Sequence, residues 1–206
     1  MSYDNAPFLI LACGALAEEI ITLLDCNKLT DKIKIQCLPA SLHNTPQKIP
    51  MEVDKFLAKN FNNYQKIFVA YGDCGTGGLL DRVLNKYKIE RLTGAHCYQF
   101  LASTKIFKQL ISDNIGSFFV TDYLLKNFNR LVWQSLGLDK YPELKDSYFA
   151  NYSHLVYLSQ SNDDNLTNKA KVIAKKLQLQ LIVKNTGFGD LGQIFTAFNQ
   201  KQLTMS

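Results

Sequence analysis

The chain has 206 residues, of which 47% are hydrophobic, so it is long enough to bury one sizeable core. Its 23 Lys and Arg residues exceed its 18 Asp and Glu residues and give a formal net charge of +5. The basic residues are spread out, with no Lys/Arg-rich block and no basic helix alternating with aromatics, so nucleic acid is not an expected partner. No apolar run reaches the roughly 18 residues of a membrane span, and no basic segment precedes the first apolar run. We therefore expect a cytoplasmic protein with no membrane partner.

Apolar runs of strand length alternate with amphipathic helical patterns along the chain. Strands are expected over residues 7–12, 33–38, 66–70, 88–92, 117–121, 154–159 and 179–183. Helices are expected over residues 15–24, 51–64, 103–112, 122–136, 165–177 and 191–198, and two more are expected to begin near 79 and 95. This alternation predicts a single α/β domain over residues 1–206. Its mostly parallel sheet would have about six strands and helices on both faces, in a Rossmann-like three-layer arrangement.

A glycine-rich stretch, Tyr71–Gly78, has the sequence YGDCGTGG and follows the strand expected over residues 66–70. It is typical of a loop between a strand and a helix. The unpaired N–H groups at a helix N-terminus stabilise a thiolate or an anion, so Cys74 is the first candidate for chemistry. The alternative is that the glycines only make the turn and Cys74 is a small buried filler.

The same stretch offers donors for a small ligand. Backbone N–H groups of the loop and one hydroxyl suit a carboxylate or a phosphate, and the candidate binding residues are Tyr71, Gly75, Thr76, Gly77 and Gly78. The loop lacks the Lys of a Walker A motif and does not match G-x-G-x-x-G, so nucleotide binding is poorly supported.

Three of the five cysteines and two of the three histidines lie just after expected strands, as does Asp122. An odd number of cysteines in a reducing compartment favours thiols, ligands or nucleophiles over disulfides. The carboxyl ends of parallel strands lie at one edge of a sheet, where ligands bind, so these side chains are expected to project near that edge. Thiolate and imidazole together are ligands for zinc or iron, and the predicted ligands are Cys13, Cys74, Cys97, His43 and His96.

A second interpretation needs no metal. In it the Cys74 thiolate is a nucleophile, His96 or His43 is its base, and Asp73 or Asp122 orients that base. The candidate catalytic residues are therefore Cys74, Asp73 and Asp122. Asp122 also has a simpler interpretation as the N-cap of the helix that it begins.

Several motifs give the chain a resemblance to a known family. They are Ala12–Leu16, Leu38–Ala40, Leu42–Pro46, Tyr71–Gly78, His96–Tyr98, Thr121–Leu124, and Asn151-Tyr152 before Val156–Leu158. With these motifs the chain resembles domain-of-unknown-function family 1638. The resemblance implies a gene context of corrinoid-dependent methyl transfer, within the one-carbon metabolism of methylated amines or related compounds.

These observations lead to three functional hypotheses. The first is a metal-dependent enzyme or accessory protein, with methyl transfer as the preferred reaction, a small-molecule substrate, and a corrinoid reached through a partner protein. The second is a non-enzymatic binding protein for a corrinoid, a methylated amine or a methyltransferase subunit. The third is a metal-free thiol enzyme acting through Cys74.

Overall fold

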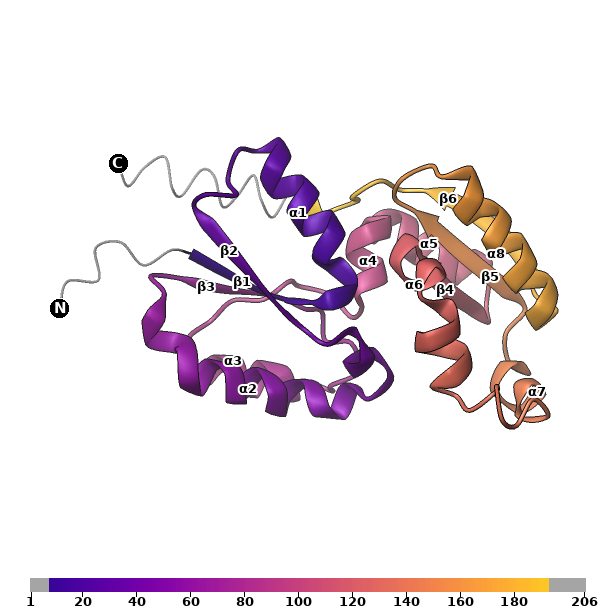
Figure 1. Ribbon diagram of the computed structural model, residues 1–206, viewed down its shortest axis with the longest axis horizontal. Helices are drawn as coiled ribbons and strands as arrows, with labels where there is room; N and C mark the ends of the chain where they lie inside the picture. Colours follow the sequence, from indigo (N-terminus) through magenta and orange to yellow (C-terminus); the bar gives the residue numbers. More distant parts are fainter. Residues whose placement is uncertain (1–7, 193–206) are drawn as a thin grey trace. The chain divides into compact units, whose positions relative to one another are not determined.

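The computed structural model describes residues 8–192. The described chain divides into two compact units (Figure 1): one holds the residues up to Cys97 together with Gly192, and the other holds Tyr98–Leu191. Each unit has its own three-stranded parallel sheet, so the α/β class and the parallel pairing are confirmed. The prediction of one sheet of about six strands was wrong, because an apolar pattern identifies strands without identifying which strands pair. The single domain over residues 1–206 stays a prediction.

The first unit is built on a sheet of strand order β2-β1-β3. Its strands are β1 (Phe8–Cys13), β2 (Ile33–Leu38) and β3 (Ile67–Ala70). The strand expected over residues 88–92 is reduced to one parallel bridge between Arg91 and Val69. The helices are α1 (Ala17–Cys26), α2 (Ile49–Asn60) and α3 (Leu79–Tyr87), with short 3₁₀ turns η1 (Gly14–Leu16), η2 (Ala40–Asn44), η3 (Pro46–Lys48) and η4 (Phe61–Asn63).

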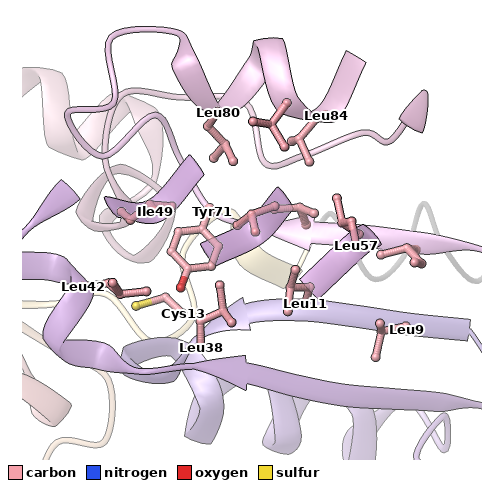
Figure 2. Packing of buried hydrophobic residues seen from close by; sticks show 14 residues of the cluster. Leu9, Leu11, Cys13, Leu38, Leu42, Ile49, Leu57, Tyr71, Leu80 and Leu84 are labelled. Atoms are coloured by element: carbon pink, nitrogen blue, oxygen red, sulfur yellow. The ribbon is translucent and has the colours of Figure 1, made fainter. Parts of the chain in front are cut away.

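Alternation along β1 explains how the helices cover this sheet. α1 lies on one face, and α2 and α3 lie on the other (Figure 1). Leu9, Leu11 and Cys13 have the two-residue spacing of one strand face, and they pack in one buried cluster with residues of α2 and α3 (Figure 2). Burial of this apolar surface is the main contribution to the stability of the unit.

The second unit has strand order β4-β5-β6, again parallel throughout. Its strands are β4 (Ser117–Thr121), β5 (His154–Ser159) and β6 (Gln180–Asn185). Its helices are α4 (Cys97–Ala102), which begins in the first unit, α5 (Thr104–Asp113), α6 (Asp122–Lys126), α7 (Leu144–Phe149) and α8 (Asp164–Leu177). Phe107 and Leu110 of α5 pack against Val156 and Leu158 of β5.

Three sequence-based expectations change in this half of the chain. The helix expected over residues 122–136 consists of α6 and a wider π-helical segment, η5 (Asn129–Gln134). α7 lies in an aromatic segment for which no helix was expected. The helix expected over residues 191–198 lies outside the described residues except for its first two positions. None of the helices within residues 8–192 is long and apolar enough to cross a bilayer.

Replacement of Leu57 by Ala is expected to lower the free energy of unfolding by about 2–5 kcal/mol, because the side chain is fully buried on α2 and its loss leaves a cavity. Met51→Ala, on the same helix and 58% exposed, is the matched control and should change it by less than about 0.5 kcal/mol. Urea unfolding of both variants measures the difference. Equal losses would contradict the packing in Figure 2.

Candidate functional site

Two segments of the first unit meet just beyond the end of β3. Asp73 N–H donates to the Gly94 carbonyl at 2.9 Å, and Cys74 N–H donates to the Ala95 carbonyl at 2.7 Å. Gly72 allows this approach, since a Cβ there would lie 3.2 Å from Gly94 O and 3.2 Å from the carbonyl carbon of His96. The glycine loop and the segment that leads into Cys97 are therefore held side by side.

This contact brings two of the predicted residues together. Cys74 Sγ lies 3.3 Å from Cys97 Sγ, although the residues are 23 positions apart in sequence. Cys74 has φ of +50°, a left-handed conformation that is uncommon for a residue with a side chain and that occurs preferentially at functional sites. It is half-buried.

The two thiols have opposite electrostatic preferences. The pKa of Cys74 is lowered, first by the hydrogen bond with the Cys97 thiol and further by the backbone N–H groups of Cys97 and Gly72, which together outweigh the opposing effects of burial and of the Asp73 charge. The pKa of Cys97 is raised well above its ordinary value, first by the same hydrogen bond and then by burial and the charge of the Cys74 thiolate. The shared hydrogen bond thus favours a Cys74 thiolate beside a Cys97 thiol.

Cys13 and Tyr71 form the buried side of this site. Burial raises the pKa of Cys13 to about 11, with a smaller contribution from the negative charge of Cys74. The buried Tyr71 hydroxyl points toward Cys13 (Figure 2), and no described nitrogen or oxygen hydrogen-bonds to it. Its pKa is raised, first by burial and then by Cys13 and Cys97, whose thiolates would repel a phenolate. Both groups stay protonated, and Cys13 is a less reactive thiol than Cys74.

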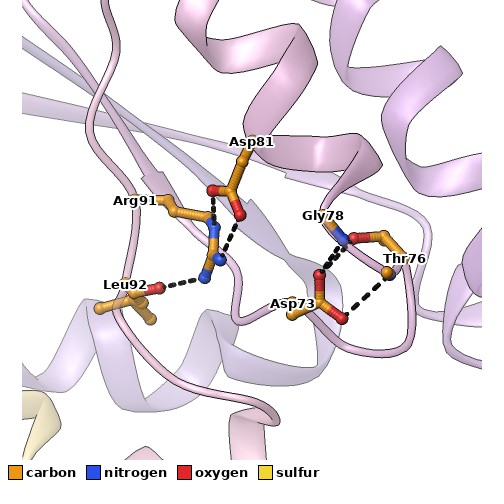
Figure 3. Close-up of polar contacts among 7 residues, drawn as sticks. Asp73, Thr76, Gly78, Asp81, Arg91 and Leu92 are labelled. Carbon is orange, nitrogen blue, oxygen red and sulfur yellow. Dashed lines mark hydrogen bonds and ion pairs between the residues drawn. The ribbon is translucent and has the colours of Figure 1, made fainter.

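The donors of the glycine loop are occupied by the loop's own Asp73 (Figure 3). One carboxylate oxygen of Asp73 accepts from Thr76 Oγ1 at 2.8 Å and from Gly78 N–H at 2.8 Å, and the other accepts from Gly77 N–H at 3.1 Å. These bonds, that of Gly78 first, lower the pKa of Asp73. These bonds give the Asp73 carboxylate a structural role. They also occupy the Thr76, Gly77 and Gly78 donors that were candidates for binding an anionic ligand. That ligand stays a prediction, as does a catalytic role for Asp73.

Sequence reasoning missed one charged residue near the site. Arg91 donates from Nε to Asp81 Oδ1 at 2.6 Å, from a second nitrogen to Oδ2 at 2.8 Å, and to the Leu92 carbonyl at 2.6 Å (Figure 3). Its pKa is raised mainly by Asp81, with smaller contributions from Asp73 and the Cys74 thiolate. The same attraction favours the thiolate of Cys74. A single Arg in a strand-like segment gave no signal of this role.

The two predicted histidines lie near each other at the surface of the first unit. The pKa of His43, on η2, is lowered, first by partial removal of its ring from water and then by the positive charge of His96. Pro46, on η3, lies next to the glycine loop, because a Cβ at Gly75 would be 3.6 Å from its ring. The long segment after β2 therefore reaches the loop that carries Cys74.

Asp122 belongs to the second unit and is buried in a complete set of partners there. Its carboxylate accepts from the Tyr157 hydroxyl at 2.7 Å, from the Gln160 and Ser161 N–H groups at 3.0 Å each, and from the Ser161 hydroxyl at 2.5 Å. These bonds join the start of α6 to the end of β5. They explain Asp122 as a residue that organises its own unit, and its catalytic role stays a prediction.

The arrangement of ligand-type residues bears on the metal hypothesis. Within residues 8–192, no three His, Cys, Asp or Glu side chains are placed so that they could hold one metal ion. The zinc or iron site with Cys13, Cys74, Cys97, His43 and His96 as ligands stays a prediction, and so does a corrinoid partner.

A comparison with known families decides where the chain belongs. Residues 37–195, more than half of the chain, match the family described as "Protein of unknown function (DUF1638)". The chain is a member of the DUF1638 family. The resemblance noted from the sequence is therefore confirmed, and the matched range includes Cys74 and Cys97 but begins after Cys13. No curated protein matches the chain. The methyl-transfer gene context of DUF1638 proteins stays a prediction.

Gly72→Ala is expected to destabilise the protein by about 1–3 kcal/mol, because the added Cβ pushes against the backbone of residues 94–96. The same push moves Cys97 away from Cys74, so the pKa of Cys74 should rise. Urea unfolding and the pH dependence of Cys74 alkylation measure the two effects. Gly77→Ala is the control: it is strained at φ of +61° but has nothing within 4 Å, so it should lose stability without changing Cys74.

Asp73→Asn is expected to lower the free energy of unfolding by about 1 kcal/mol at pH 7, since the amide presents N–H groups to donors of the loop. The pKa of Asp73 is lowered in the folded state, so its contribution is complete above the unfolded pKa of about 4 and is lost as pH falls through the folded pKa. The difference between wild type and variant should therefore shrink below about pH 4. Urea unfolding at neutral and acidic pH measures it, and a constant difference would show that the charge contributes nothing.

Proposed function

We propose that the protein is an enzyme in which the Cys74 thiolate attacks an electrophilic atom of a small molecule. The observation that supports it most is the 3.3 Å contact between the Cys74 and Cys97 sulfurs, together with the lowered pKa that the contact gives to Cys74. Thiolates are the reactive form of cysteine, so a thiol that is ionised more readily is the better nucleophile near neutral pH.

The surroundings of Cys74 support the same role. Backbone N–H groups of Gly72 and Cys97 favour its thiolate, and the positive charge of Arg91 attracts it. Cys74 follows β3 at the carboxyl end of a parallel sheet, which is where α/β folds bind their ligands. Because the thiolate is favoured by these contacts, the proposal needs no histidine as a base.

The experiment is alkylation of the reduced protein with iodoacetamide across a range of pH, with the modified sites identified by peptide mass spectrometry. We expect Cys74 to be labelled first, with a pH midpoint below the ordinary pKa of a cysteine thiol. The exposed Cys26, on α1, is the internal reference for an accessible thiol, and buried Cys13 should be labelled last.

The variants Cys97→Ala and Cys26→Ala test the cause of the lowered pKa, since alanine cannot donate a hydrogen bond to the Cys74 thiolate. Cys97→Ala should move the Cys74 midpoint upward, because the largest contribution to its lowered pKa is removed. Cys26→Ala should leave it unchanged. If Cys74 reacts no faster than Cys26 at every pH, the proposal is wrong.

A further inference from the structure

The pair of thiols suggests more than a single nucleophile. Cys74 lies in the loop after β3, and Cys97 is the first residue of α4. Their sulfurs are 3.3 Å apart, while a disulfide bond is about 2.05 Å long, so a relative movement of about 1.2 Å would join them. The hydrogen bonds from Asp73 and Cys74 to Gly94 and Ala95 already hold the two backbones next to each other.

The two sulfurs are also suited to different steps. Cys74 is half-buried and favours the thiolate, which is the form that attacks an incoming molecule. Cys97 stays a thiol while Cys74 is charged, because the Cys74 hydrogen bond and charge both raise the pKa of Cys97. Once Cys74 is bonded to another sulfur it carries no charge, and these two causes disappear. Cys97 then ionises more readily, next to the bond that it would attack.

We propose that Cys74 and Cys97 are the attacking and resolving cysteines of a thiol–disulfide exchange site whose substrate class is an organic disulfide. The proposal rests on the proposed function, since both use Cys74 as the nucleophile, and it names the substrate class of that site.

The exchange has two steps. In the first, the Cys74 thiolate bonds to one sulfur of the substrate; the substrate's S–S bond breaks, and the other sulfur leaves as a thiolate with the bonding electrons. In the second, Cys97 gives its proton to solvent and its sulfur attacks Cys74 Sγ; the bond between Cys74 and the substrate sulfur breaks, and the remaining half of the substrate leaves as a thiolate with the bonding electrons and takes up a proton from solvent. The substrate disulfide is reduced to two thiols, and the protein dithiol is oxidised to a disulfide. A dithiol reductant reverses both steps and restores the pair.

The experiment uses the full-length reduced protein and oxidised glutathione as the probe, without oxygen. Intact and peptide mass spectrometry follow the products in wild type, Cys97→Ser, Cys74→Ser and Cys26→Ser. We expect wild type and Cys26→Ser to form a Cys74–Cys97 disulfide with no glutathione retained at Cys74. Cys97→Ser should keep one glutathione on Cys74, and Cys74→Ser should lose the reaction at this site.

The outcomes separate the two proposals. If wild type keeps glutathione on Cys74 as Cys97→Ser does, Cys97 is not a resolving cysteine, while Cys74 remains a nucleophile. A disulfide between Cys74 and Cys13 instead would also overturn the assignment of Cys97. If Cys74 is unmodified in both wild type and Cys97→Ser, this inference fails; the proposed function fails with it only if iodoacetamide also labels Cys74 no faster than Cys26 in the same samples. Peptide mapping of wild type decides the matter even if a variant does not fold.

Discussion

The site depends on the close approach of two backbone segments beyond the end of β3. Two hydrogen bonds, from the N–H groups of Asp73 and Cys74, fix residues 94–95 against the loop, and Gly72 has no side chain to keep them apart. The lowered pKa of Cys74 depends mainly on this contact, because the strongest stabilising partners of its thiolate are the thiol and N–H of Cys97. A thiol contact is short-ranged, so a displacement of a few tenths of an ångström in residues 94–97 weakens it. The backbone geometry of residues 72–74 and 94–97 therefore determines how readily the Cys74 thiol ionises.

Hydrogen bonds within the glycine loop hold it in the conformation that this contact requires. Asp73 closes the loop on itself through Thr76, Gly77 and Gly78, and the left-handed conformations at Cys74, Gly75, Gly77 and Gly78 make that closure possible. As a result, the hydrogen-bond donors of Thr76, Gly77 and Gly78 bind the Asp73 carboxylate of the same loop. The thiolate is favoured by N–H groups of Gly72 and Cys97, and neither belongs to α3, the helix after the loop whose N-terminus the sequence suggested.

The sequence pattern predicted local structure well and long-range contacts poorly. The bounds of β2, β4 and β5 agree with the expected strands, because the alternation in β2, the short apolar runs in β4 and β5, and the flanking turn residues specify them locally. The partition into two sheets had no local signal. Cys74 was recognisable from its glycine loop, but its pairing with Cys97 depends on hydrogen bonds to Gly94 and Ala95 that carry no motif. The role of Asp73 was within reach, since an Asp followed by Thr and glycines is typical of a loop closed by its own side chain.

The charge balance among the three neighbouring cysteines favours a nucleophile at this site. Burial is the main cause of the raised pKa of Cys13, and the charge of Cys74 adds to it. At Cys97 the hydrogen bond with Cys74 raises the pKa first, followed by burial and by the charges of Cys74 and Cys13. At Cys74 burial and the charge of Asp73 also oppose ionisation, but the hydrogen bonds outweigh them, and Arg91 attracts the thiolate. Because the pKa of Cys74 is lowered and those of Cys13 and Cys97 are raised, Cys74 is the first of the three thiols to ionise. Two protonated sulfurs then lie next to one reactive sulfur. Of the two, Cys97 is in hydrogen-bond contact with Cys74, so loss of the charge on Cys74 changes Cys97 most directly.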